Sequence, residues 1–304
     1  MKEKTVFFDL DDTLYDRSGP YLAAFRQFFG GRYEDKAAQA YQAVMHRGYE
    51  VFTAAHTGKI SMDAMHIYRH QIGLLDVGIR ITAAQALQLQ AIYAAQQQRI
   101  TLSAAVRAAL DYCREAYRAV GVITNGSVGP QQGKLRSLGL DRWAEAKLVF
   151  ISDACGVMKP APEIFRLAQA AAGGGPCVFV GDSCSQDIAG ASACGWQTIW
   201  LSRTGEEPTT APTLTARSEQ DLLPCLQALA EGRKGSPLRG AVCEADGEVV
   251  SNLPQPLRLG VPPSHLPWKG RLWCCAPTAS PMMRINSRNR KKDDKRRKKR
   301  DSKV

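Results

Sequence analysis

The feature that most constrains the fold is a repeated alternation of short apolar runs with longer amphipathic segments. The runs are rich in β-branched and aromatic residues, as buried strands are. The segments between them carry apolar residues three and four positions apart, which is typical of helices that cover a core. Repeated strand–helix units predict an α/β fold in which helices flank a parallel sheet. The expected strands are 5–10, 119–127, 147–152, 176–183 and 197–202, and the expected helices are 104–117, 129–139, 161–172, 187–195 and 218–232.

One long segment interrupts this alternation. Residues 17–99 carry successive helical patterns and almost no strand-like run. We therefore expect an all-helical insert directly after the first strand. Residues 1–16 and 100–232 would then form the core that contains the sheet.

The net charge of +11 is concentrated at the C-terminal end. Residues 284–304 hold 12 Lys or Arg and 3 Asp, which leaves the rest of the chain near neutral. Residues 233–304 contain 8 of the 16 prolines and few periodic apolar runs, so we expect a disordered, Pro-rich and basic tail. Its charge suits non-specific contact with nucleic acid or acidic surfaces. Sequence-specific readout is not expected, because no aromatic residues are interleaved with the basic ones.

The composition favours a cytoplasmic protein. No apolar run approaches the ~20 residues of a membrane span, and the N-terminal MKEKTVFFDL does not resemble a secretory signal. Nine cysteines with no CxxC pair and no regular spacing argue against a disulfide framework or a zinc site. Reduced thiols are the simplest interpretation.

Clusters of polar residues follow three of the expected strands. They are Asp9–Thr13, Thr124–Ser127 and Asp182–Ser183. In open parallel sheets, ligands bind outside the carboxyl ends of the strands. The three clusters should therefore meet at one edge of the sheet and form the functional site.

Asp9 and Asp11 are the most informative pair in the first cluster. They are two positions apart, so they would point the same way in a strand, and a bend at the strand end would let both reach one cavity. Two neighbouring carboxylates suit two roles, one as nucleophile or metal ligand and the other as proton carrier. Their repulsion calls for a cation, and oxygen ligands favour Mg²⁺. Asp182 and Asp187 would complete the acidic group, although Asp187 could instead cap the following helix.

The other two clusters suit a phosphate group. Thr124 follows an apolar strand, and Asn125-Gly126 favours a tight turn whose hydroxyl and backbone N–H groups could bind phosphate oxygens. Lys159 precedes Pro160, which prevents a helix from running through it and allows a new one to begin. A lysine fixed beside the acidic cluster could neutralise charge on both nucleophile and phosphate.

Together these motifs resemble those of the haloacid dehalogenase-like (HAD) hydrolase superfamily, over about residues 4–230. The four motifs stand in that family's order: DLDDT at Asp9–Thr13, TNGS from Thr124, Lys159 before Pro160, and GDSCSQD from Gly181 to Asp187. The helical insert resembles the cap of the first subclass. The resemblance implies a Rossmann-like parallel sheet core, formed by 1–16 and 100–232, with an inserted helical cap at 17–99.

The resemblance also implies phosphoryl transfer through an aspartyl-phosphate. Asp9 would attack phosphorus, and Asp11 would protonate the leaving oxygen and then activate water. The implied Mg²⁺ ligands are Asp9, Asp11 through its backbone carbonyl, and Asp182, with Asp187 supporting the metal or orienting Lys159. The implied phosphate-binding residues are Thr124, Asn125 and Lys159.

Asp11 favours phosphate over halide chemistry, because the dehalogenases of the superfamily lack an acid at this position and do not use Mg²⁺. The form DLDDTLYD looks most like phosphatases of the nucleotidase and flavin-mononucleotide phosphatase type. We therefore expect hydrolysis of a small phosphorylated metabolite, such as a nucleotide or a sugar phosphate. One alternative is a phosphotransferase or phosphomutase, although such mutases usually have Gly-Val in place of Asp12-Thr13. Another is a nucleic-acid-associated protein that acts through the basic tail.

Several residues carry weaker signals. Gln186 departs from the Asn or Glu of many relatives, and Arg17 lies where a cap hinge is expected. His66 and His70 are four apart on one helix face, a spacing that could bind metal but that an amphipathic helix also explains. No role is predicted for Asp12 or Asp16.

Overall fold

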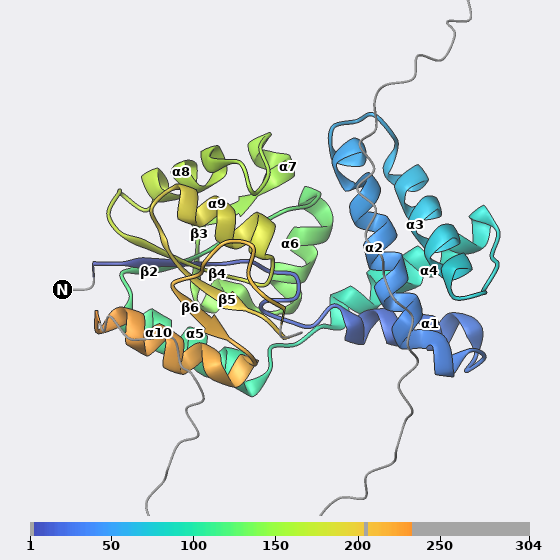
Figure 1. Ribbon diagram of the computed structural model, residues 1–304, viewed down its shortest axis with the longest axis horizontal. Coiled ribbons are helices and arrows are strands. Elements are labelled where there is room, and N and C mark those ends of the chain that lie inside the picture. Colours follow the sequence, from blue (N-terminus) through green and yellow to red (C-terminus); the bar gives the residue numbers. More distant parts are fainter. Residues whose placement is uncertain (1–2, 204–205, 233–304) are drawn as a thin grey trace, which may run out of the picture. The chain divides into compact units, whose positions relative to one another are not determined.

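Six parallel strands form the centre of the fold. The structure, a computed structural model, describes residues 3–203 and 206–232. The strands lie in the order β3–β2–β1–β4–β5–β6, and every neighbouring pair is parallel (Figure 1). Their bounds are Thr5–Phe8 (β1), Ala119–Thr124 (β2), Ala144–Ile151 (β3), Cys177–Gly181 (β4), Gln197–Leu201 (β5) and Leu214–Ala216 (β6). The predicted α/β fold is confirmed, whereas the predicted tail, 233–304, lies outside the described residues.

Helices cover both faces of the sheet, as its apolar strands require. In β1, Val6 and Phe8 belong to the hydrophobic cluster on one face and Phe7 to the cluster on the other. The first face is covered by α5 (Ala104–Ala116) and α10 (Leu222–Ala230), and the second by α8 (Pro162–Ala171) and α9 (Ala189–Ala193) (Figure 1). The remaining helices of this part are α6 (Val128–Ser137) and α7 (Ser152–Cys155).

Four buried aromatic rings hold the second face together. Phe7 stacks on Trp196 with 5.3 Å between ring centroids. Phe165 of α8 lies edge-on to Phe179 of β4 at 5.3 Å and to Trp196 at 5.5 Å. Burying each phenylalanine contributes about 1.5–3 kcal/mol, and each well-oriented ring pair adds about 0.5–1.5 kcal/mol. These contacts fix α8 against the sheet, and with it the loop that precedes α8.

The segment after β1 is helical, as predicted. Its helices are α1 (Ser18–Phe29), α2 (Ala37–His56), α3 (Met62–Asp76) and α4 (Ala83–Gln96). The hydroxyls of Ser61 and Thr82 cap α3 and α4 by accepting hydrogen bonds from the N–H groups of Ala64 and Gln85. The four helices share a third hydrophobic cluster around the fully buried Tyr21. The division into a core and a cap domain stays a prediction.

No helix in the described part of the chain combines the length and the apolar character that crossing a membrane requires.

The edge strand β6 is not apparent from the sequence. Leu214–Ala216 has three residues, too few to show a periodic pattern. Its position depends on tertiary pairing, with Leu214 opposite Ile199 of β5 and the Ser202 N–H donating to the Ala216 carbonyl at 2.9 Å.

The register of the central strands positions the polar clusters. Phe8 of β1 lies opposite Val122 of β2 and Val180 of β4. The residues just beyond Phe8, Val122 and Val180 therefore lie together at the carboxyl edge of the sheet. They include Asp9, Thr124 and Asp182.

The packing of α2 on α3 supplies a test of the helical segment. A Cβ atom at Gly73 would lie 2.6 Å from the Cα and 2.7 Å from the backbone nitrogen of Val44. Gly73→Ala must therefore push the helices apart, and we expect the free energy of unfolding to fall by about 1–3 kcal/mol. Urea denaturation followed by circular dichroism measures the change.

Gly48→Ala is the matched control, because Gly48 also lies inside a helix. The three atoms that a Cβ atom there would meet first all belong to the flexible side chain of Arg69, the nearest at 3.4 Å. The gain in helix propensity should leave stability unchanged or raise it by up to about 1 kcal/mol. Equal stabilisation by both substitutions would contradict the observed contact between α2 and α3.

Candidate active site

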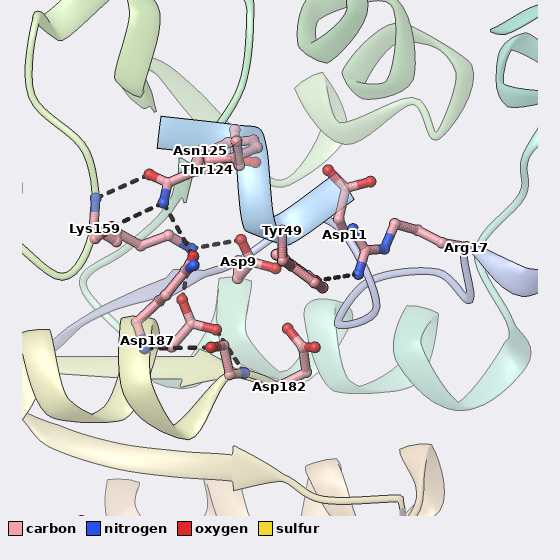
Figure 2. Close-up of a pocket in the computed structure, with 12 residues that line it drawn as sticks. Asp9, Asp11, Arg17, Tyr49, Thr124, Asn125, Lys159, Asp182 and Asp187 are labelled. Carbon is pink, nitrogen blue, oxygen red and sulfur yellow. Dashed lines mark hydrogen bonds and ion pairs between the residues drawn. The ribbon is translucent and has the colours of Figure 1, made fainter. Parts of the chain in front are cut away.

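Strand ends and loops bring the predicted site residues to one small cavity. Asp9 follows β1, Thr124 ends β2 and Asp182 follows β4. Lys159 lies in the loop between α7 and α8, and Asp187 lies in a turn of π-helix at Cys184–Ile188. All of them line a cavity of about 60 Å³ (Figure 2). The chemical roles assigned to them from the sequence stay predictions.

Lys159 is a buried ammonium group between two carboxylates. Its Nζ donates to Asp9 Oδ1 and to Asp187 Oδ1, each at 2.6 Å (Figure 2). Burial alone would lower the pKa of Lys159, but Asp187 and Asp9 outweigh it and the pKa is raised. Burial raises the pKa of Asp9 to about 7, Lys159 opposes the rise, and the nearby charges of Asp187 and Asp11 add to it. The lysine is thus a fixed positive charge whose removal would leave buried acids unpaired.

The Asn125 side chain holds the backbone of the Lys159 loop. Its Oδ1 accepts from the Lys159 N–H at 2.9 Å, and its Nδ2 donates to the Lys159 carbonyl at 3.0 Å. Nδ2 also donates to Gln186 Oε1 at 3.1 Å, so both amide hydrogens have acceptors. Gln186, noted as a departure from relatives, takes part in positioning this loop. Because both side-chain hydrogens are used, a contact of Asn125 with a phosphate would have to come from its backbone N–H.

Asp187 faces the site instead of capping the next helix. Besides Lys159, it bonds the Ser183 N–H through Oδ2 at 3.0 Å. Helix α9 begins at Ala189 with no side-chain hydrogen bond at its N-cap. A Cβ atom at Gly181 would lie 2.3 Å from Asp187 Oδ2. Because Gly181 has no Cβ atom, the carboxylate of Asp187 can occupy this space.

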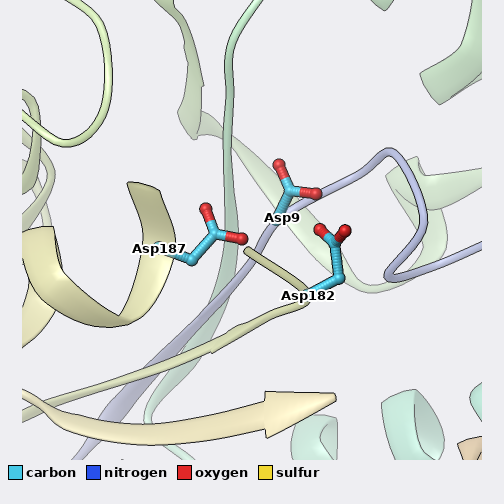
Figure 3. A group of neighbouring side chains, drawn as sticks. All are labelled: Asp9, Asp182 and Asp187. Atoms are coloured by element: carbon cyan, nitrogen blue, oxygen red, sulfur yellow. The ribbon is translucent and has the colours of Figure 1, made fainter. Parts of the chain in front are cut away.

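Asp9, Asp182 and Asp187 form the one group of His, Cys, Asp or Glu side chains in the described residues that could hold a metal ion (Figure 3). Each offers a carboxylate oxygen within 4.8 Å of the others. The Asp182 carboxylate accepts no hydrogen bond from any described residue. Its pKa is raised by burial and further by Asp187 and Asp9. Three acids beside one lysine leave excess negative charge, and this all-oxygen set fits a hard divalent cation such as Mg²⁺.

Asp11 lines the same cavity but is paired differently. Lys134 Nζ lies 2.7 and 2.9 Å from its two oxygens, and the Tyr15 hydroxyl donates to Oδ1 at 2.5 Å. Burial acts to raise the pKa of Asp11, but Lys134, Arg17 and the hydrogen bond from Tyr15 lower it overall. Figure 2 shows its carboxylate on the side of Asp9 away from Lys159.

The sequence predicts that a metal ion and Lys159 neutralise Asp9 and Asp11. In the structure a second lysine, Lys134, neutralises Asp11. Lys134 and Gln131 lie three residues apart on α6, a helix with few apolar residues whose buried positions are Gln131, Gly133 and Lys134. One available signal is that α6 directly follows the Thr124 motif, which places its first turns near the site.

Thr124 keeps a donor for a ligand. Its Oγ1 accepts from Gln131 Nε2 at 2.5 Å. The hydroxyl hydrogen of Thr124 is not used in that bond and can be donated to a ligand. The same Gln131 nitrogen donates to Asp11 Oδ2 at 3.0 Å. Gln131 thus links the predicted phosphate-binding residue to the predicted proton carrier.

Two further acids, one in the first motif and one just after it, have structural contacts. Asp12, at a φ of 60°, pairs with Arg17 at 2.5 Å and accepts from its backbone N–H at 2.9 Å. Arg17 also donates to the Tyr49 hydroxyl of α2 at 2.7 Å, which links the first motif to the helical segment (Figure 2). Asp16 accepts from the N–H and the hydroxyl of Ser18 at 2.7 Å at the start of α1.

The histidine pair predicted as a weak metal candidate does not converge. His70 is buried, and its Nε2 lies 3.0 Å from Gln90 Oε1. The oxygen of Gln90 also accepts from Arg69, so Nε2 of His70 must carry the hydrogen and donate. His66 lines a neighbouring cavity instead.

Known proteins share both sequence and fold with this chain. It is 32% identical over 134 residues to the phosphoserine phosphatase of Thermus thermophilus, an alignment that spans 43% of this chain and about half (53%) of that relative. It is 28% identical over 236 residues to the ribulose-1,5-bisphosphate 5-phosphatase of Halopiger xanaduensis, covering 74% of this chain and 96% of the relative. The crystal structure of the putative HAD-hydrolase YfnB from Bacillus subtilis, bound to magnesium, has a similar fold. Its TM-score is 0.57 at 22% identity, covering 75% of this chain and all of YfnB.

The profile of the haloacid dehalogenase-like hydrolases matches residues 3–195, which is well over half of the chain. The match includes all four motifs and the helical segment between the first two. The chain is a member of the haloacid dehalogenase-like hydrolase family.

Proposed function

We propose that this chain is a Mg²⁺-dependent phosphatase of a small phosphorylated metabolite, acting through an aspartyl-phosphate on Asp9. The arrangement around Asp9 carries the proposal. Its Oδ1 is fixed by Lys159 at 2.6 Å, while its Oδ2 accepts no hydrogen bond from any described residue. A carboxylate with one oxygen held and the other open to a cavity is positioned for attack on a phosphorus atom.

The names of relatives support phosphate ester chemistry. Both relatives described above are phosphatases of small phosphorylated molecules by name. The acid at Asp11 supports the same choice, because a proton carrier is needed to release an alkoxide leaving group.

Asp9 and Asp11 together account for the bonds and the protons that change in the proposed reaction. Asp9 forms a P–O bond as the bond from phosphorus to the leaving oxygen breaks, and that oxygen takes a proton from Asp11. Water then attacks the phosphoryl group, gives a proton to Asp11, and the P–O bond to Asp9 breaks. Inorganic phosphate and the free alcohol are the products.

Charge neutralisation does most of the catalytic work in such a transfer. Lys159 and the Thr124 hydroxyl would bind oxygens of the transferring group. Asp9, Asp182 and the backbone carbonyl of Asp11 would hold Mg²⁺, with Asp187 fixing Lys159 beside them. When bound there, the ion would supply positive charge that offsets the charge of the phosphate.

Asp11 has to change partners in this scheme. Lys134 and Tyr15 stabilise its charged form, which makes it a poor acid in the observed arrangement. Its side chain must leave Lys134 to donate a proton to the leaving oxygen. The rings of Tyr49 and Phe52 line the same cavity from α2 and would exclude water while the transfer proceeds.

Asp9→Asn tests the nucleophile. An amide cannot form the acyl phosphate, so release of inorganic phosphate from p-nitrophenyl phosphate should fall at least about 10³-fold. Asp16→Asn is the matched control from the same segment, since the Asp16 side chain is exposed and hydrogen-bonds only to Ser18 among the described residues, and it should stay within about 2-fold of wild type. Full activity of the Asp9 variant would refute the proposal. Isomerised product without phosphate release would favour a phosphomutase instead.

Metal removal tests the acidic group. Activity should vanish in excess EDTA and return with Mg²⁺, because three carboxylates need a cation before an anionic substrate can approach. Asp182→Asn removes one oxygen ligand and should raise the half-saturating Mg²⁺ concentration at least about 10-fold. Undiminished turnover in EDTA would exclude a role for the metal.

A further inference from the structure

A second cavity adjoins the one at Asp9 on the side of the helical segment. Its volume is about 200 Å³. The two cavities share lining residues from both parts of the chain: Asp11, Arg17, Tyr49, Phe52 and Asn125. The leaving group of a substrate held at Asp9 would therefore lie in this second cavity. The volume is below the ~300–1,000 Å³ of sites for drug-sized ligands, so it suits a small metabolite.

The cavity carries more positive than negative charge. Its cationic lining residues are Arg17, Arg69 and Lys134. Arg17 pairs with Asp12 at 2.5 Å, and Lys134 pairs with Asp11 at 2.7 Å. Arg69 pairs with no carboxylate among the described residues. It is therefore the cation of this cavity whose charge the described chain leaves unmatched.

The contacts of Arg69 hold its side chain in place without neutralising it. Nη2 donates to Gln90 Oε1, and the guanidinium carbon lies 5.9 Å from the ring centre of Tyr93. Its Nε is buried and has no hydrogen-bond partner in the described structure. Burial lowers the pKa of Arg69, and the nearby charge of Arg17 lowers it further, while Tyr93 and Tyr21 act in the opposite direction. Arg69 is half-buried as a residue, but leaving its buried Nε without an acceptor is costly unless an anion completes the site.

We propose that Arg69 binds a second anionic group, a carboxylate or a phosphate, carried by the leaving group of the substrate. The inference rests on the proposed phosphatase function and narrows its substrates to phosphate esters that bear another anion. A guanidinium presents its donors in a planar fork that matches two oxygens of such a group. Gln90 takes one of these donors and fixes the orientation of the fork.

His56 adds a polar contact to the same cavity. Its Nδ1 donates to the Phe52 carbonyl at 3.0 Å, because a carbonyl oxygen can only accept. In the neutral ring this leaves Nε2 as an acceptor, and Nε2 is buried without a partner in the described structure. A hydroxyl on the leaving group would satisfy it.

Matched esters test the proposal. 3-Phosphoglycerate and glycerol 3-phosphate differ by a carboxylate in place of a hydroxymethyl group, and propane-1,3-diol bisphosphate and its monophosphate differ by a second phosphate. With the full chain and Mg²⁺, kcat/KM should favour the anion-bearing member of at least one pair by about 10-fold or more. Arg69→Met should lower kcat/KM for that member about 10- to 100-fold. For the other member of the pair, whose leaving group is neutral, kcat/KM should change by less than about 3-fold.

Control variants separate binding from folding. Arg69→Lys keeps the charge and should retain part of the preference. Arg80→Met removes an exposed arginine of the same helical segment and should change neither ester. Thermal unfolding of each variant identifies any loss that comes from misfolding.

Two results would overturn the inference: equal rates for both members of each pair in the wild type, or an equal loss for both members in Arg69→Met. Failure of the phosphatase proposal looks different, since no ester would then release phosphate. Calorimetric binding to the Asp9→Asn variant decides the role of Arg69 in that case. The anion-bearing ester should bind at least about 10-fold more tightly than its partner, and adding Arg69→Met should remove the difference.

Discussion

The ion pairs of Lys159 with Asp9 and Asp187 are the interaction on which the site depends. Without the lysine, three carboxylates with oxygens within 4.8 Å of one another would remain at the sheet edge. Two like charges about 4 Å apart repel by ~4 kcal/mol at an effective dielectric constant of 20. One ammonium offsets only part of this repulsion, so the residual negative charge is available to a metal ion. The loop of Lys159 is held by Asn125 and by the aromatic packing of α8, which makes the charge a fixed part of the fold.

Most of this geometry could be predicted from the sequence, because it follows from strand ends. Asp9, Thr124 and Asp182 each follow an apolar run, and parallel strands in register bring such residues to one edge. The direction of Asp187 was left open, because a residue before a short helix can also cap it. Only its hydrogen bond to Ser183 and its ion pair with Lys159 show which contact is made.

The partners of Asp11 could not be predicted for a physical reason. Lys134 lies 123 residues away in the sequence, on a helix that shows no apolar stripe to indicate which face is buried. An ion pair between distant elements depends on how those elements pack, and no local spacing encodes it. The same holds for Arg69. Its helix has an amphipathic pattern, and the sequence does not show which carboxylates the fold brings near the guanidinium. Strand β6 was missed because three residues carry too little periodicity.

Gly181 shows how the site constrains a residue with no chemistry of its own. Its φ lies outside the left-handed region, so flexibility of the backbone does not explain the glycine. The space for a methyl group there is already filled by the carboxylate of Asp187. Alanine at this position would force that acid away from Lys159 while leaving Asp9 and its strand in place. In a comparison of sequences, this glycine therefore reports whether the acid and the lysine can touch, even though it binds neither substrate nor metal.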